Sequence, residues 1–313
     1  MKTHRLGSSG PELSVIGFGA WEAGGGREWG RSPTEEQVLE AIRTVPDTGI
    51  NWIDTAEVYG GGRSEELVGR AVAGRREGLL IATKVAPAPE GSGFRPEDIA
   101  RAIRGSLRRL GTDHVDLYQL HWPDETGVPV EDSWGAMASL VDEGLVGFVG
   151  VSNFDRDLIE RCETVRHVDS LQQEFSMLNL DDRDLIRWCG EQGTGVVTYG
   201  PLAYGLLTGA ITMETAFAEG DHRGEDTRMF PQGKREQSLA VVDGMRPLAE
   251  RLGVTVAQLA LAWNVHQPGV TAAIAGSRDP GHVRSNAAAG DADLDEAVLA
   301  ELDALLSLGP AAA

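Results

Sequence analysis

The chain has 313 residues, of which 41% are hydrophobic and 24% charged, and its formal net charge is −20. These fractions are typical of a soluble globular protein with ample material for a core, so disorder is not expected. The negative charge argues against a surface for nucleic acid or anionic membranes, which needs clustered Lys and Arg. Length alone leaves open two domains or one large α/β barrel.

Cysteine usage and the N-terminus indicate a cytoplasmic protein. Cys162 and Cys189 are the only cysteines, and each lies in a helix-like pattern. Neither a disulfide framework nor a CxxC metal site is available, so we expect two reduced core thiols and no metal. The first seven residues lack the apolar stretch of a signal peptide, and no run approaches a membrane span.

The predicted elements begin with a short hairpin over 6–13 and a strand over 15–19. The run Ser32-Pro33-Thr34-Glu35 is typical of a capping box with Pro at the first helical position, and predicts a helix to about Asp47. Ser64, followed by two glutamates, predicts another helix N-cap. Further strands are predicted over 50–54, 79–85, 115–120, 146–151, 170–173, 194–199 and 270–275, and helices over 64–74, 96–110, 131–143, 155–166, 181–191, 255–266 and 280–289.

This alternation makes eight βα units when the first strand is counted. Alternating units imply a parallel sheet, either doubly wound or closed, and eight favours a (β/α)8 TIM barrel. Gly111, Gly144 and Gly193 follow predicted helices, as C-terminal caps do. We therefore expect a single α/β domain over 1–313, with an N-terminal β-hairpin and a loose tail over 306–313.

The alternation is interrupted once, by a long insertion over 200–254 after the seventh strand. It contains a polar stretch at 219–235 and a predicted helix at 236–252. An insertion that follows a barrel strand lies at the catalytic face, so it is a candidate lid. The alternative is a flexible loop that does not cover the site.

Four polar side chains are predicted at one mouth of this barrel. Asp54 ends the second strand and Tyr59 follows it; Lys84 is near the end of the third strand, and His121 follows the fourth. Lys84 is one of only three lysines among 28 basic residues, so its place in a buried strand requires a partner. Each residue alone has an ordinary interpretation: a turn former, a packing phenol or a core histidine. Together they indicate a site.

The chemistry that needs these four residues is proton donation by a phenol. A free tyrosine ionises near pH ~10. The ammonium of Lys84, anchored by Asp54, would lower the pKa of Tyr59. A neutral His121 would orient a carbonyl oxygen so that Tyr59 donates a proton to it. No side chain donates hydride, so a reduced cofactor is required.

The usual dinucleotide fingerprints are absent. The run 17–22 begins like GxGxxG but has Glu22 in place of the last glycine, and Gly60-Gly61-Gly62 is not followed by Lys-Ser/Thr. A phosphate site could instead come from the late barrel loops. The run 275–280 offers backbone amides, a hydroxyl and a guanidinium before a helix, although an ordinary capped turn would look the same.

Several motifs, in order along nearly the whole chain, resemble the aldo-keto reductase family. They lie at 49–56, 59–60, 62–65, 83–84, 116–121, 150–154, 172–176 and 276–278, with Asn286. The resemblance implies a (β/α)8 barrel that binds NADPH, with Tyr59 as the general acid. It also implies that Asp54 and Lys84 tune Tyr59, and that His121 orients the carbonyl.

The same resemblance implies how the cofactor would be held. Ser152, Asn153 and Gln172 would hold the nicotinamide carboxamide, and Tyr199 would stack on the ring. Loop residues after the seventh strand would line the pyrophosphate, and those after the eighth would take the adenosine end. The implied cofactor-binding residues are Trp21, Asp54, Ser152, Asn153, Gln172, Tyr199, Gly200, Pro201, Leu202, Gly205, Gly276, Ser277, Arg278, His282 and Asn286, and the implied substrate contacts are Trp21, Tyr59, His121 and Trp122.

The choice of cofactor rests on Arg278, which beside Ser277 suits a 2'-phosphate and so favours NADPH over NADH. Three positions depart from many relatives: Gly200, Ala275 and His282 stand where Ser, Pro and Arg or Gln are found. A lost hydroxyl and a lost strong cation leave NADH possible.

We therefore predict an NADPH-dependent oxidoreductase that reduces a small aldehyde or ketone to an alcohol. One alternative is a cofactor-binding regulatory protein that resembles the potassium-channel β subunits. Another is a barrel hydrolase or lyase that uses Asp54 and Lys84 without a nicotinamide. The absence of HxH or clustered carboxylate ligands counts against its metal-dependent forms.

Overall fold

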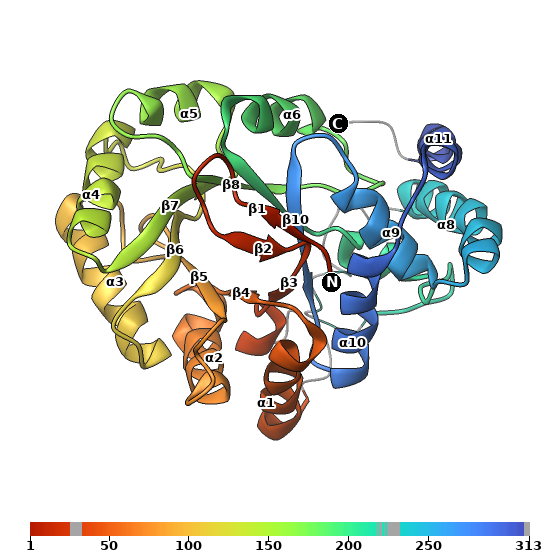
Figure 1. Ribbon diagram of the computed structural model, residues 1–313, viewed down its shortest axis with the longest axis horizontal. Coiled ribbons are helices and arrows are strands. Elements are labelled where there is room, and N and C mark those ends of the chain that lie inside the picture. Colours follow the sequence, from red (N-terminus) through yellow and green to blue (C-terminus); the bar gives the residue numbers. More distant parts are fainter. Residues whose placement is uncertain (26–32, 218, 220, 222, 224–231, 310–313) are drawn as a thin grey trace.

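A closed barrel of parallel strands forms the centre of the protein, in the order β10-β3-β4-β5-β6-β7-β8-β9. The computed structural model describes residues 1–25, 33–217, 219, 221, 223 and 232–309. Helices surround the barrel on its outer side (Figure 1), so the predicted (β/α)8 TIM barrel is confirmed. The barrel strands are β3 (Ile16–Gly19), β4 (Trp52–Asp54), β5 (Leu80–Val85), β6 (Val115–Leu120), β7 (Val146–Ser152), β8 (Ser170–Glu174), β9 (Gly195–Tyr199) and β10 (Val270–Gly276).

The helices follow the strands and bury one apolar side against them. Their bounds agree with the predicted ranges to within a few residues, and Gly111 and Gly193 end helices in the left-handed conformation, as predicted. A last helix, α11, was not predicted. The α-helices within the described residues are α1 (Glu35–Thr44), α2 (Arg63–Val72), α3 (Pro96–Leu110), α4 (Val130–Asp142), α5 (Arg156–Glu163), α6 (Arg183–Gln192), α8 (Gln232–Leu252), α9 (Val256–Val265), α10 (Pro280–Ala288) and α11 (Glu296–Leu305).

Two predicted helix starts were wrong. The capping box of α1 joins Thr34 to Gln37, so the helix begins after Pro33. The backbone of Thr34 is extended and its side chain accepts from the amide of Gln37, which decides the cap. Ser64 lies inside α2, where its hydroxyl donates to the carbonyl oxygen of Ala20 at 2.6 Å. Gly62, with φ of 94°, is the N-cap of α2 instead.

The predicted N-terminal hairpin closes one end of the barrel. Its strands, β1 (Thr3–Arg5) and β2 (Glu12–Ser14), pair in antiparallel fashion and lie across the barrel opening in Figure 1. Leu6 and Leu13 are buried there, and they belong to the same apolar cluster as Trp52, Leu117 and Val197 of the barrel interior. The barrel interior at this end is therefore filled with apolar side chains.

Toward the opposite end, where the parallel strands finish, the buried interior becomes polar. Asp54, Lys84, Ser152 and Gln172 are all buried there. Burying polar groups costs free energy unless they are hydrogen-bonded. A cluster of them at one end of a barrel therefore marks the functional face.

The insertion after β9 is partly described. It begins with the 3-10 helix η5 (Ala203–Thr208), and its later part forms α8, which packs against α9, α11 and η5 on the flank of the barrel (Figure 1). The predicted helix at 236–252 is thus confirmed, with an earlier start at Gln232. Most of the polar stretch at 219–235 lies outside the described residues, so the lid stays a prediction. The tail begins with η7 (Leu306–Leu308), and 310–313 lie outside the described residues.

Candidate active site

The four predicted catalytic residues meet at the carboxyl ends of neighbouring strands. Asp54 is the last residue of β4, Lys84 is next to last in β5, and His121 directly follows β6. These strands are adjacent in the barrel, so their ends converge. Tyr59 begins the short 3-10 helix η4 (Tyr59–Gly62) on the connection from β4 to α2. The structure brings all four side chains together.

The ammonium of Lys84 lies at the centre of this group, and the side chain is 0% exposed. Its Nζ donates to Oδ1 of Asp54 at 2.5 Å, to the carbonyl oxygen of Thr55 at 2.9 Å and to Oη of Tyr59 at 3.1 Å. Burial alone would lower the pKa of Lys84, but Asp54 and then Tyr59 raise it above its ordinary value. Lys84 therefore stays charged at neutral pH.

The second carboxylate oxygen of Asp54 is also occupied. Its Oδ2 accepts from Nε2 of Gln172 at 2.9 Å. Gln172 was predicted to hold the nicotinamide carboxamide, which stays a prediction, and its amide nitrogen donates to the ion pair here. A buried ion pair is stable only when further hydrogen bonds satisfy its remaining groups, and Gln172 supplies one.

The hydroxyl of Tyr59 lies between Lys84 and His121. Burial raises the pKa of Tyr59 above its ordinary value, while Lys84 lowers it and Asp54 raises it again. Lys84 lowers this pKa as predicted, but the cost of burying a phenolate outweighs the nearby ammonium in the net shift. Tyr59 consequently keeps its proton at neutral pH, which is the form that can donate it.

His121 faces the same hydroxyl. Its Nε2 lies 3.5 Å from Oη of Tyr59, and its buried Nδ1 has no hydrogen-bond partner among the described residues. Burial first, and then the charge of Lys84, hold the pKa of His121 well below its usual range. The imidazole is therefore neutral at physiological pH, and with its proton on Nε2 it is a hydrogen-bond donor directed at the mouth.

Aromatic rings line the space beside these groups. The ring of Trp21 lies 6.1 Å from that of Tyr59 and 6.5 Å from that of Tyr204, and Trp122 lies 4.6 Å from His121. Trp21 and Trp122 were predicted as substrate walls. Tyr204 was missed, although an aromatic residue next to Gly205 in the loop after a barrel strand was a usable signal. Apolar walls around a few polar groups are typical of small-molecule sites.

Asn153 links the catalytic group to the residues predicted to hold the nicotinamide. Its φ is 60°, a left-handed conformation that is uncommon outside glycine but less so for Asn. Its Nδ2 donates to the carbonyl oxygen of His121 at 3.0 Å and to Oγ of Ser152 at 3.1 Å. Its Oδ1 accepts from the hydroxyl of Tyr199 at 2.8 Å. The structure thus groups Ser152, Asn153 and Tyr199 beside His121.

The loop after β9 has a tightly turned backbone. Gly200 and Gly205 have φ of 66° and 100°, and Ala203 and Tyr204 have φ of 46° and 53° between them. Such strain in non-glycine residues concentrates at ligand-binding loops. Pro201 and Leu202 lie inside this turn, so the predicted pyrophosphate-binding residues form one short segment at the mouth.

The predicted adenosine end lies where β10 leads into α10. Ser277, on this connection, and Asn286, within α10, are each 8% exposed. The carboxylate of Asp279 already accepts from the amides of Gly281 and His282. The N-terminus of α10 is therefore capped by its own residue, and the cationic side chain of Arg278 becomes the main candidate for a phosphate at this end.

Arg278 has a partner that was not predicted. Its Nε lies 3.7 Å from Oε2 of Glu22, which follows Trp21 after β3. The sequence had shown Glu22 only as the residue that interrupts a glycine motif. β3 and β10 are neighbours in the closed barrel, so residues that follow them meet at the mouth.

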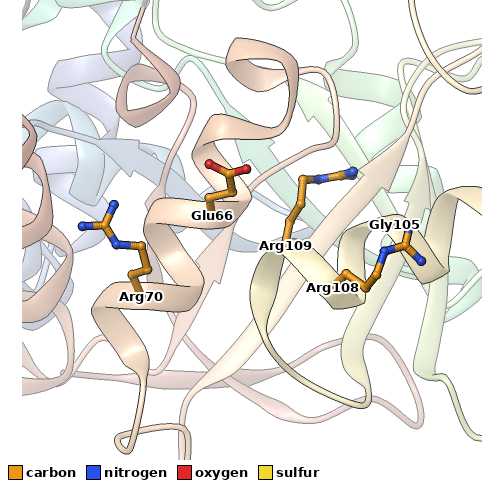
Figure 2. Close-up of a pocket in the computed structure, with 5 residues that line it drawn as sticks. All are labelled: Glu66, Arg70, Gly105, Arg108 and Arg109. Atoms are coloured by element: carbon orange, nitrogen blue, oxygen red, sulfur yellow. The ribbon is translucent and has the colours of Figure 1, made fainter.

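A hollow on the outer surface lies away from these residues. Figure 2 shows the residues that line it, with Glu66 and Arg70 on α2 and Arg108 and Arg109 on α3. The Nε of Arg109 donates to the buried carboxylate of Glu65 at 2.6 Å, so this arginine joins two helices. None of the predicted site residues lines this hollow.

Two further findings concern only the part of the chain that the structure describes. There, no helix is both long enough and apolar enough to cross a membrane. No group of three or more His, Cys, Asp or Glu side chains is arranged to hold a metal ion.

With this geometry in view, the comparisons with known proteins identify the family. The model of the aldo/keto reductase family matches residues 15–307. The chain is 38% identical over 296 residues to aldo-keto reductase YhdN of Bacillus subtilis, covering 91% of this chain and 87% of that protein. The chain therefore belongs to the aldo/keto reductase family, as the motifs indicated, and it is an oxidoreductase of that family.

Other relatives differ in what their names state. An NADH-specific methylglyoxal reductase of Escherichia coli is 31% identical, covering 95% of this chain and 96% of that protein. A probable voltage-gated potassium channel subunit beta of Arabidopsis thaliana is 30% identical, covering 93% of this chain and 92% of that protein.

Solved structures agree with the barrel. A glycerol dehydrogenase of Gluconobacter oxydans superposes with a TM-score of 0.87 at 32% identity, covering 97% of this chain and 95% of that one. An aldo-keto reductase of Klebsiella pneumoniae, in complex with NADPH, gives a TM-score of 0.77 at 32% identity, covering 99% and 96%. The family uses nicotinamide dinucleotides and acts on small carbonyl compounds.

Proposed function

We propose that this protein reduces aldehydes or ketones to alcohols with NADPH, and that Tyr59 is the general acid. The observation that carries this proposal is the arrangement of two groups around one hydroxyl. Oη of Tyr59 accepts from the charged Lys84 at 3.1 Å and lies 3.5 Å from Nε2 of a neutral His121. A carbonyl oxygen placed here would meet two donors at the point where negative charge develops.

The proposed reaction transfers one hydride and one proton to the carbonyl group. A reduced nicotinamide, when bound, would supply the hydride that reduces the carbonyl carbon. Tyr59 transfers its hydroxyl proton to the carbonyl oxygen as the C=O π bond breaks, and the resulting phenolate takes a proton from solvent. Lys84 stabilises that phenolate, and Asp54 keeps Lys84 charged and in place.

The residues at the mouth fit a dinucleotide. Asn153 and Ser152 present amide and hydroxyl groups beside His121, and Tyr199 is positioned by its bond to Asn153. The turn after β9 brings backbone groups to the mouth, and Arg278 offers a guanidinium beyond it. We propose that these residues hold the nicotinamide, the pyrophosphate and the 2'-phosphate, respectively, as the family resemblance implies.

A regulatory function is the second candidate. It is favoured by the similarity to the probable potassium-channel β subunit over almost all of both chains. Such a protein would keep the barrel and bind the dinucleotide with negligible turnover.

The loss of NADPH absorbance in the presence of a panel of aromatic, aliphatic and sugar-like aldehydes tests the proposal, with NADH run in parallel. We expect turnover that depends on both the carbonyl compound and the dinucleotide. Dinucleotide that is released only on denaturation, with no turnover on any aldehyde, would favour the regulatory function. Failure to bind either dinucleotide would refute both.

A further inference from the structure

The side chain of Glu22 lies over the end of β10. Glu22 begins the 3-10 helix η1 (Glu22–Gly24), directly after Trp21. A Cβ atom added to Gly276 would lie 3.6 Å from Oε1 of Glu22, and Oε2 lies 3.7 Å from Nε of Arg278. The carboxylate therefore lies beside Gly276, at the end of β10, and Arg278, in the following loop. Both residues are proposed to bind the cofactor.

Basic groups from three separate segments act electrostatically on this carboxylate. Burial raises the pKa of Glu22, while Arg278, Arg223 and His282 oppose that shift in this order. Arg278 follows β10, Arg223 belongs to the insertion after β9, and His282 lies in α10. In a chain with a net charge of −20, such a group of basic side chains is suited to an anion. In this structure Arg223 pairs with Asp221 at 2.7 Å, and Glu22 is the carboxylate that lies beside Arg278.

The side chains of Glu22 and Arg278 are only 26% and 19% exposed, so water screens their interaction poorly. A phosphate that approaches Arg278 meets the negative charge of Glu22 at the same time. The 2'-phosphate distinguishes NADPH from NADH, so this repulsion acts on NADPH more strongly than on NADH.

Resting on the proposed function, we propose that Glu22 is a specificity-determining residue. Its carboxylate competes with the 2'-phosphate of NADPH for Arg278 and so reduces the preference of the site for NADPH over NADH. The residue that interrupts the glycine motif thereby sets how strongly the enzyme selects between the two dinucleotides.

The test is the dissociation constant of each dinucleotide, measured by calorimetry for the wild type, Glu22→Gln and Glu22→Asp. Glu22→Gln keeps the size of the side chain and removes its charge. We expect the NADPH constant to fall about tenfold, equivalent to ~1.4 kcal/mol, and the NADH constant to change by less than about threefold. Glu22→Asp keeps the charge and is expected to keep most of the wild-type ratio.

The matched control is Glu66→Gln, which removes a carboxylate from the outer hollow of Figure 2 and should leave both constants unchanged. An unchanged or larger NADPH constant in Glu22→Gln would overturn the competition, since it would mean that Glu22 is neutral or holds Arg278 in place for the phosphate. An equal fall in the dissociation constants of NADPH and NADH would overturn the assignment of the competition to the 2'-phosphate.

Failure of the proposed function would give a different binding result from failure of the role of Glu22 alone. If neither the wild type nor Glu22→Gln bound either dinucleotide, both the proposed function and the competition would be refuted. If the wild type bound NADPH and Glu22→Gln bound it no better, the proposed function would stand and only the role of Glu22 would fall.

Discussion

Replacing Lys84 by Met should destabilise the protein strongly. Lys84 and Asp54 are 0% and 4% exposed, and their atoms approach to 2.5 Å. Without the ammonium, the Asp54 carboxylate keeps, among the described residues, only the hydrogen bond from Gln172 at 2.9 Å, so it is left buried without a counter-charge. Breaking a buried ion pair in this way costs about 3–5 kcal/mol. We expect a loss of ~4 kcal/mol in the free energy of unfolding.

Urea unfolding, followed by tryptophan fluorescence, measures this loss. The double variant Lys84→Met with Asp54→Leu removes both charges, so it should be more stable than Lys84→Met alone. The control is Lys2→Met, because Lys2 forms an exposed ion pair with Asp293 at 3.0 Å and its loss should not change the unfolding curve. Wild-type stability in Lys84→Met, or a double variant that loses the sum of the two single effects, would refute the reasoning.

Three further predictions concern single groups. Arg278→Ala should raise the apparent KM for NADPH far more than that for NADH. Equal effects on both in steady-state assays would refute the role of Arg278 in binding the 2'-phosphate. His121, whose pKa is held well below its usual range by burial and Lys84, should show no protonation step near pH ~6.5 in NMR titration. Because the unfolded chain binds that proton and the folded protein does not, this residue lowers stability as pH falls below about 6.5, and a normal titration would contradict both statements. Burial raises the pKa of the Cys162 and Cys189 thiols to about 12, so a thiol reagent at pH ~8 should label neither until the protein unfolds; rapid labelling of the native protein would contradict their burial.

The grouping of the catalytic residues could be predicted because residues at the carboxyl ends of barrel strands meet at one face, however far apart they are in the sequence. Asp54, Lys84 and His121 each lie at the end of a predicted strand, and parallel strand ends meet at one face. Only the strand positions were needed for this step. Hydrophobic runs bounded by glycine and polar residues supply those positions with an error of one or two residues.

The direction of the Tyr59 pKa shift could not be predicted in the same way. Its charged neighbour is visible in the sequence, but the burial of the phenol depends on how Trp21 and the loops pack around it. Desolvation outweighs the ammonium, and desolvation is a property of the packed structure. Both wrong N-caps have a similar origin, since Ser64 is a good capping residue type but the backbone conformation places the cap at Gly62.

The contact between Glu22 and Arg278 was missed although its signal was present. One residue follows the first barrel strand and the other follows the last, and closure of the barrel makes these strands neighbours. Helix α11 was missed because no strand follows it, so the alternation that located the other helices gave no indication there. Its N-cap, Asp295, accepts from the amide of Val298 and was a usable signal.

The central claim is that Tyr59 is the proton donor, and Tyr59→Phe tests it most directly. The variant loses the hydroxyl that contacts Lys84 and His121 but keeps the ring. The control is Tyr118→Phe, because the buried hydroxyl of Tyr118 has no hydrogen-bond partner among the described residues. We predict that Tyr59→Phe binds NADPH as the wild type does and reduces aldehydes at least ~100-fold more slowly, while Tyr118→Phe turns over normally. Near-normal aldehyde reduction by Tyr59→Phe would contradict the account.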